Sequence, residues 1–188
     1  MSALVPHTSS AALTAAQAPA TAEPGQYLTF MLAGEVFAIG ILAIKEIIEY
    51  HSLTEVPMMP ACVRGVINLR GAVVPVMDPL ARFGRKSSDV TKRTCIVIVE
   101  TEVDNDGRLE RQVIGVVVDA VNEVLEIASS DIEPAPAFGA RIRSEFIQGV
   151  GKVKGKFVIL LDVNHVLSID EIGQAGGPVA AEAASLAH

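Results

Sequence analysis

The chain has 188 residues, half of them apolar, and a formal net charge of −7, so it can bury a core without a metal ion or a disulfide. The acidic balance, and the absence of any basic stripe among the 15 Lys and Arg residues, exclude a nucleic-acid-binding surface. No apolar run approaches the roughly 18 residues that a transmembrane helix needs, so we expect a protein partner and no direct membrane insertion.

Both ends of the chain are poor in large apolar side chains. Residues 1–25 and 171–188 are mainly Ala, Thr, Pro, Ser and Gly, and such segments bury too little surface to offset the entropy of ordering. We therefore expect a disordered N-terminal tail over 1–25, a flexible C-terminal tail over 171–188, and one folded region over 26–170.

The folded region begins with two predicted hairpins separated by a predicted helix. Residues 27–32 and 35–40 are short apolar runs joined by Ala33-Gly34, which predicts a hairpin. The spacing of Ile41, Ile44, Ile47 and Ile48 predicts an amphipathic helix that ends near residue 50. Residues 63–69 and 72–77 predict a second hairpin through 70–71, with the proline at 75 at an edge or a bulge.

The second half is predicted to repeat this order. Strands are expected over 94–101 and 112–118, joined by a polar loop over 102–111 that lacks the ligand spacing of a calcium-binding EF-hand. A short helix over 119–125, a Pro-rich loop over 129–140, strands within 146–161 and a short helix over 162–167 follow.

An internal repeat underlies this similarity. Residues 63–78 align with 147–162 at a constant offset of 84, and residues 36–49 align with 113–126 at an offset of 77. Self-similarity on this scale is typical of two packed copies of one module. Short strands with glycine-rich turns favour small β-barrels, so we expect two barrels related by a pseudo-twofold axis, from halves of roughly 26–90 and 91–170.

The sequence contains no pattern that indicates catalysis, a cofactor or a metal site. Cys62 and Cys95 lie far apart without ligand spacing, which favours free thiols in a reducing cytosol. The four histidines have no nucleophile motif beside them, and Gly149-Val-Gly151 lacks the following glycine and helix of a dinucleotide site. Asp78 and Asp162 each follow an apolar strand, which favours helix capping.

The two halves differ at one charged position. Asn68-Leu-Arg-Gly71 in the first half becomes Lys152-Val-Lys-Gly155 in the second, and only arginine offers a planar fork to a carboxylate. Glu46 is a candidate partner for Arg70. Two interpretations remain open: a surface salt bridge of little consequence, or a pair that shapes a groove to which the isoleucines at 41, 44 and 47 contribute apolar contact area.

Several motifs together resemble the CheW-type coupling proteins of bacterial chemotaxis. They are Gln26-Tyr-Leu-Thr-Phe, Glu35-Val-Phe-Ala-Ile-Gly-Ile, Ile44-Lys-Glu-Ile, Arg64-Gly-Val-Ile-Asn-Leu-Arg-Gly71, Pro75-Val-Met-Asp78, Gly115-Val-Val-Val-Asp119, Asp131-Ile-Glu-Pro-Ala-Pro136 and Gly149-Val-Gly151. The resemblance extends over residues 26–169. It implies a mainly β fold, two pseudo-symmetric and intertwined five-stranded SH3-like β-barrels with short helices, also used by the regulatory domain of the CheA histidine kinase.

The resemblance also implies a function. Such proteins are non-catalytic adaptors, without a cofactor, that couple the cytoplasmic tips of methyl-accepting chemoreceptors to the CheA regulatory domain in signalling arrays at the inner membrane, and self-association within arrays would follow. The same adaptor role in twitching motility or a developmental pathway is an alternative with the same fold. An enzyme or a ligand-binding barrel would need a convergent polar pocket, which the sequence does not indicate.

Site residues follow from matching positions. The resemblance implies a receptor-binding groove to which the Glu46–Arg70 pair and neighbouring residues of both halves contribute. Motif positions shared with the family are expected to form turns and supporting contacts. The expected groove residues are Ile41, Ile44, Glu46, Ile47, Arg64, Arg70, Gly115 and Val121, and the expected structural positions are Gly65, Asn68, Gly71, Asp78 and Gly149.

Overall fold

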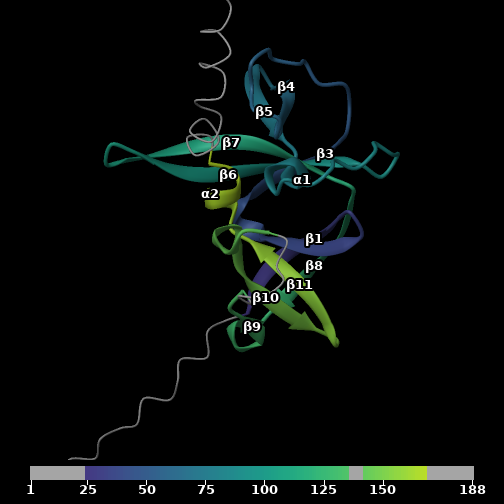
Figure 1. Cartoon of the computed structure of the whole chain (residues 1–188). Helices are drawn as coiled ribbons and strands as arrows, with labels where there is room; N and C mark the ends of the chain where they lie inside the picture. Colours follow the sequence, from purple (N-terminus) through teal and green to yellow (C-terminus); the bar gives the residue numbers. More distant parts are fainter. Residues whose placement is uncertain (1–23, 136–141, 169–188) are drawn as a thin grey trace, which may run out of the picture.

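A computed structural model describes residues 24–135 and 142–168 of the chain (Figure 1). The two expected tails lie outside this part, apart from residues 24 and 25, and so do residues 136–140 of the expected Pro-rich loop. No helix within the described ranges is long and apolar enough to cross a membrane.

Strands make up most of the described chain. They are β1 (Gly25–Leu32), β2 (Glu35–Gly40), β3 (Ile44–Glu49), β4 (Val63–Leu69), β5 (Ala72–Met77), β6 (Cys95–Asn105), β7 (Arg108–Val118), β8 (Ala120–Ile127), β9 (Ile132–Glu133), β10 (Ile147–Val153) and β11 (Lys156–Leu161). The helices are short: α1 (Pro79–Arg82), α2 (Val163–Val166), and the 3₁₀ turns η1 (Ile41–Ala43), η2 (Ser129–Asp131) and η3 (Ser144–Phe146).

The strands form two sheets that exchange strands between the sequence halves. One sheet has the order β8-β1-β2-β11-β10-β9 and the other the order β3-β6-β7-β5-β4. The first sheet takes the β1–β2 hairpin from the first half and its other strands from the second, whereas the second sheet takes the β6–β7 hairpin from the second half and its other strands from the first. The expected mainly β class with two pseudo-symmetric five-stranded units is confirmed, with the two-residue β9 as an addition.

Each sheet closes on itself in the same way. The chain after β3 forms a bridge between Thr54 and Val66 of β4, and the chain after β8 pairs Glu133 with Val150 of β10. The partners on β4 and β10 in these two bridges, Val66 and Val150, are equivalent at the offset of 84. Because each bridge joins the segment after one edge strand to the opposite edge strand, both sheets curl into barrels.

All four hairpins turn through two residues. In each turn, both residues have positive φ, as at Arg70 (53°) and Gly71 (85°), which is the type I′ geometry that suits a hairpin. The predicted loop over 102–111 is wrong, because β6 and β7 stay paired as far as Asn105 and Arg108. In this hairpin only residues 106–107 form the turn, so it extends well beyond the barrel (Figure 1).

Two predicted helices are wrong. Residues 41–50 form η1 followed by strand β3, and residues 120–127 form strand β8. Along β3, half-buried and exposed residues alternate strictly, the period of a strand with one covered face. The isoleucine spacing resembled a helix because Ile41 lies in η1 and Ile47 lies on the exposed face of β3, whereas Ile44 and Ile48 lie on its half-buried face.

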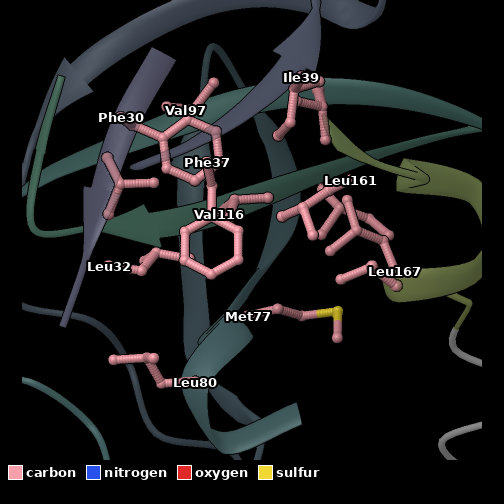
Figure 2. Close-up of a cluster of buried hydrophobic side chains, with 14 of the residues drawn as sticks. Phe30, Leu32, Phe37, Ile39, Met77, Leu80, Val97, Val116, Leu161 and Leu167 are labelled. Carbon is pink, nitrogen blue, oxygen red and sulfur yellow. The ribbon is translucent and has the colours of Figure 1, made fainter. Parts of the chain in front are cut away.

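The core has three parts. The largest lies between the barrels and includes Phe30 and Phe37 of one sheet and Val97 and Val116 of the other (Figure 2). Smaller clusters fill the interior of each barrel. Strand β6 is buried on both faces, since Ile96 and Ile98 point into one barrel while Val97 and Val99 face the shared core, which explains its continuous apolar sequence.

Candidate binding surface

The ion pair expected between Arg70 and Glu46 is present at the seam of one barrel. A guanidinium nitrogen of Arg70 lies 3.1 Å from a carboxylate oxygen of Glu46. Glu46 lies on β3 and Arg70 in the β4–β5 turn, and β3 and β4 are the two ends of the strand order. The pair therefore connects the two edges that the curled sheet brings together.

The three isoleucines near this seam are not equally available. Ile47 is the most open, with 42 % of its surface exposed. Ile41 and Ile44 are half-buried and pack against the core between the barrels. Beside them, Lys45 forms an ion pair with Glu100 at 2.7 Å. The seam thus presents a narrow apolar strip bordered by charged pairs.

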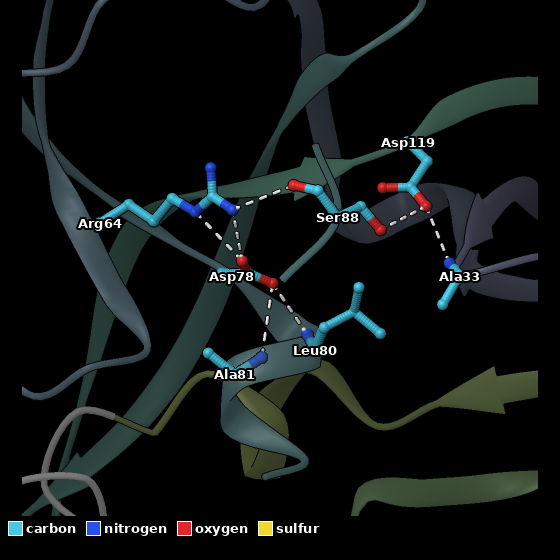
Figure 3. Close-up of polar contacts among 7 residues, drawn as sticks. All are labelled: Ala33, Arg64, Asp78, Leu80, Ala81, Ser88 and Asp119. Carbon is cyan, nitrogen blue, oxygen red and sulfur yellow. Dashed lines mark hydrogen bonds and ion pairs between the residues drawn. The ribbon is translucent and has the colours of Figure 1, made fainter. Parts of the chain in front are cut away.

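Arg64 forms an ion pair with a different carboxylate from the one that Arg70 contacts. Its guanidinium contacts Asp78 through Nε at 3.0 Å and through Nη2 at 2.9 Å, and Nη2 also donates to the carbonyl oxygen of Ser88 at 3.5 Å. The Ser88 hydroxyl donates to Asp119, which also accepts from the Ala33 backbone N–H (Figure 3). This network links one barrel, the connection between the halves and the β1–β2 turn of the other barrel.

The environment of Arg64 favours its charge. Burial alone would lower the pKa of the guanidinium, but the Asp78 carboxylate and the Tyr50 hydroxyl oppose this and leave the pKa raised above its usual value. The carboxylate of Asp78 is almost fully buried. A buried charge needs a partner and hydrogen bonds, so Arg64 is a structural support next to the seam.

Of the two groove residues expected from the second half, Gly115 is buried and Val121 is half-buried. Gly115 is buried, and a Cβ there would come within 2.8 Å of Cγ2 of Ile96 and 3.1 Å of Cγ2 of Val76. It therefore allows close packing inside the barrel. Val121 is half-buried and packs against the core between the barrels. Neither contributes to the exposed strip around Ile47.

The expected structural positions have clear roles. Asp78 caps α1 by accepting from the N–H groups of Leu80 and Ala81, and Asp162 caps α2 in the same way, so both predicted caps are confirmed. Asn68 accepts from the N–H of Gly71 at 2.9 Å and fixes the β4–β5 turn.

Gly65 and Gly149 permit the two barrel closures. A Cβ at Gly65 would lie 2.5 Å from the backbone oxygen of Thr54, and one at Gly149 would lie 2.6 Å from Cγ2 of Ile132. The segments that cross over these glycines are the closing bridges. The repeated glycine is therefore required by the close approach of another segment.

Two exposed apolar side chains were missed from the sequence. Leu42 on η1 is 99 % exposed, and Met58 in the 50–62 segment is fully exposed. Leu42 could have been found as an apolar residue between Ile41 and Ile44 that the helical pattern did not use. Met58 gave no periodic signal, because it lies in a loop.

The polar groups of the described residues are arranged for support and contact. None of their buried side-chain nitrogen or oxygen atoms lacks a hydrogen-bond partner, and no cluster of His, Cys, Asp and Glu in the described ranges could hold a metal ion. Cys62 is buried and Cys95 half-buried, both as free thiols.

Comparison with known proteins gives consistent results. The profile of the CheW-like domain matches residues 26–171. A chemotaxis protein CheW of Klebsiella aerogenes is 32 % identical over 147 residues, which is 78 % of this chain and 84 % of that protein. One from Rhizobium meliloti is 32 % identical over 146 residues, or 78 % and 89 % of the two chains.

A solved structure agrees with these relatives. The crystal structure of the scaffolding protein TtCheW from Thermoanaerobacter tengcongensis matches with a TM-score of 0.67 and 32 % sequence identity. The match covers 79 % of this chain and 91 % of that one.

Proposed function

The chain belongs to the CheW-like domain family, and on that premise we propose that it is a non-catalytic scaffold that couples chemoreceptors to the CheA histidine kinase. The observation that carries the proposal is the family match over residues 26–171, nearly the whole described chain. The relatives named above are chemotaxis proteins, and the solved one is called a scaffolding protein. The proposed location is the cytoplasm, at receptor arrays on the inner membrane.

The seam of the β3-containing barrel is the proposed receptor-binding surface. Ile47 supplies exposed apolar area, and the Arg70–Glu46 pair holds the two barrel edges beside it. An amphipathic helix can place its apolar face on such a strip while its polar flanks meet the surrounding charges. Ile41 and Ile44 would support the strip from below, because they pack against the core between the barrels.

The kinase is proposed to bind elsewhere on the chain. Its regulatory domain has the same two-barrel fold in the family that this chain resembles, so barrel ends are the natural contact. Each contact would be weak alone, and an array would strengthen them through multivalency. Self-association within the array is part of this proposal.

Purified components test the proposal. The full chain would be titrated by calorimetry with the cytoplasmic fragment of a chemoreceptor from the same bacterium, and separately with the CheA regulatory domain. Glu46→Arg and Arg70→Glu should each weaken receptor binding at least about ten-fold, the effect of roughly 1.4 kcal/mol. The double reversal should recover part of the affinity, because it restores the pair across the seam.

A matched control separates the seam from general surface charge. Arg143 is 70 % exposed and also lies in an ion pair, with Glu145 at 2.6 Å, which shares no residue with the seam. Arg143→Glu should leave receptor affinity within about two-fold, as expected for an exposed pair. Failure of the unmodified chain to bind either receptor or kinase would contradict the adaptor role itself.

A further inference from the structure

The β6–β7 hairpin is longer than its counterpart in the first half of the chain. The β1–β2 hairpin turns immediately before Glu35, and the equivalent of Glu35 at the offset of 77 is Gln112. In the second half, β6 and β7 continue beyond that point over residues 102–111, which we call the arm. The arm extends well beyond the barrel (Figure 1). All of its residues are exposed except the half-buried Val103, so the arm adds little to the core.

Both edges of the arm lack a strand partner within the described residues. Strand β3 pairs with β6 only as far as Val99, and β5 pairs with β7 only at Gly115 and Val116. The arm is thus a ribbon of two strands, which is marginally stable in water by itself. An unpaired edge presents backbone N–H and C=O groups to which another chain can pair.

One hydrogen bond shows which residues of the arm point these groups outward. The N–H of Glu102 donates to the side-chain oxygen of Asn164 at 3.2 Å, so it points away from β7. Residues opposite each other in an antiparallel ladder both point their backbone groups outward or both inward, and the two kinds of pair alternate. Arg111 lies opposite Glu102. The backbone groups of Arg111 and of Leu109 therefore point away from β6 and are available at the outer edge of β7.

The outer edge of β6 is protected against pairing with a second copy of itself. Its outward positions are Glu100, Glu102 and Asp104. An antiparallel pairing of these positions would set carboxylates opposite each other, which is destabilising. The Asn164 side chain also occupies the N–H of Glu102. Charged side chains of this kind are a common protection of edge strands.

The outer edge of β7 is complementary to itself in one register. In an antiparallel pair centred on Leu109, this leucine faces its own copy, and Arg108 of each chain faces Glu110 of the other. The side chain of Leu109 is 72 % exposed. A pair centred on Arg108, Glu110 or Arg111 would instead set identical charges against each other at the centre. Only the register about Leu109 combines an apolar centre with opposite charges on both sides.

We propose that two copies of the chain dimerise by pairing the outer β7 edges of their arms, antiparallel about Leu109. The N–H and C=O groups of Leu109 exchange hydrogen bonds with those of its copy, and two Arg108–Glu110 pairs flank them. The two ribbons then form one continuous sheet. The contact is isologous, with the same residues on both sides of a twofold axis. It involves one short strand from each chain, so the dimer is weak and depends on concentration.

The inference rests on one part of the proposed function, self-association, and assigns it a surface. Dimerisation is measured without a receptor or a kinase, so the two proposals can fail separately. A monomeric chain that binds receptor and kinase would overturn the pairing of the arms and leave the coupling role intact. A dimeric chain that binds neither would contradict the coupling role alone.

Sedimentation velocity of the full-length chain and two charge variants tests the pairing. The average mass of the unmodified chain should rise toward that of a dimer between about 10 µM and about 1 mM, the range of a small interface. Arg108→Glu and Glu110→Arg each set like charges opposite each other at both flanking positions. Each variant alone should therefore dimerise at least about ten-fold more weakly.

An equimolar mixture of the two variants is the decisive sample. In a mixed dimer each arginine again faces a glutamate at both flanking positions, so the mixture should dimerise about as well as the unmodified chain. A change of surface charge without antiparallel pairing about Leu109 would not produce this rescue. A monomeric unmodified chain, undiminished dimers in either variant, or a mixture as weak as the separate variants would each overturn the proposal.

Disulfide trapping distinguishes the two edges of the arm. Leu109→Cys would be combined with Cys95→Ser, while the buried Cys62 is retained. The matched control is Glu102→Cys in the same background, because Glu102 is exposed and lies on the outer edge of β6. Under mild oxidation, Leu109→Cys should form intermolecular disulfides at least about ten times faster than the control, because pairing raises the effective concentration of the two thiols. Equal rates, or faster trapping at Glu102→Cys, would overturn the assignment to the β7 edge.

Discussion

At the scale of single residues, one aspartate position shows how the repeat was modified. Asp78 and Asp162 both cap a short helix, but only Asp78 has a guanidinium partner, because the equivalent of Arg64 is Gln148. The first copy therefore buries an ion pair, while the second keeps its carboxylate partly solvated. The same backbone geometry thus accommodates a buried ion pair at Asp78 and a partly solvated carboxylate at Asp162.

Replacing Arg64 by Gln should destabilise the fold. The Asp78 charge would remain buried without its partner, and such a loss typically costs a few kcal/mol, so we expect the free energy of unfolding to fall by about 2–4 kcal/mol. Urea denaturation followed by circular dichroism measures it. Arg70→Gln is the matched control and should cost about 0–1 kcal/mol, because Arg70 is 80 % exposed. Equal losses for both would contradict a buried role for Arg64.

The two thiols should differ in reactivity. Burial raises the pKa of the Cys62 thiol, and burial together with the charge of Glu49 raises that of Cys95. Both should therefore react more slowly than free cysteine at pH 8, because less thiolate is present. Cys95 is accessible and should be labelled first by Ellman's reagent, whereas Cys62, only 7 % exposed, should react only on unfolding. Labelling of both thiols at one rate would refute this order.

At the scale of elements, hairpins were predictable from the sequence and the third strand of each module was not. Turns such as Arg70-Gly71 carry their own local signal, since positive φ at both positions favours glycine. The sequences of β3 and β8 do not alternate apolar and polar residues, because β3 carries isoleucines on both its half-buried and its exposed face and β8 has a register shift in its pairing with β1. Their β-branched residues favoured strand, but the isoleucine spacing matched a helix better.

The candidate site was predictable to a similar extent. The Arg70–Glu46 pair followed from a local motif and a charge difference between the copies, and it is present even though Glu46 was expected on a helix. Gly115 could not be placed from sequence, because its neighbours Ile96 and Val76 come from other strands. The exposure of Leu42 likewise depends on how the barrels pack.

The closing bridges explain the repeated glycines, and this can be tested. Gly65→Ala would place a methyl carbon only 2.5 Å from the carbonyl oxygen of Thr54. The closing segment that contains Thr54 would therefore have to move. We expect a loss of about 1–3 kcal/mol in the free energy of unfolding. Gly40→Ala is the control, since a Cβ there meets nothing within 4 Å, and should change stability by less than about 1 kcal/mol. Unchanged stability in Gly65→Ala would show that the closing segment yields easily.

At the scale of the whole molecule, the two sequence halves are not the two barrels. The β3-containing barrel takes β6 and β7 from the second half, and the other barrel takes β1 and β2 from the first. The core between them draws on both halves as well, with Phe30 and Met77 from the first and Val116 and Leu161 from the second (Figure 2). A repeat in sequence therefore does not imply two separable folding units.

This exchange predicts that neither half folds alone. Residues 26–90 would lack β11, the partner of β2, and β7, the partner of β5. Residues 91–170 would lack β1 and β2, the partners of β8 and β11. Isolated hairpins are marginal in water, so each half should give a disordered amide spectrum by nuclear magnetic resonance. The two halves mixed at equal concentration should regain the dispersed spectrum of the intact chain, because the parallel pairings of β2 with β11 and of β5 with β7 need both halves. A dispersed spectrum from either half by itself would mean that one half can fold into a barrel alone. The exchange of strands between the halves would then not be required for folding.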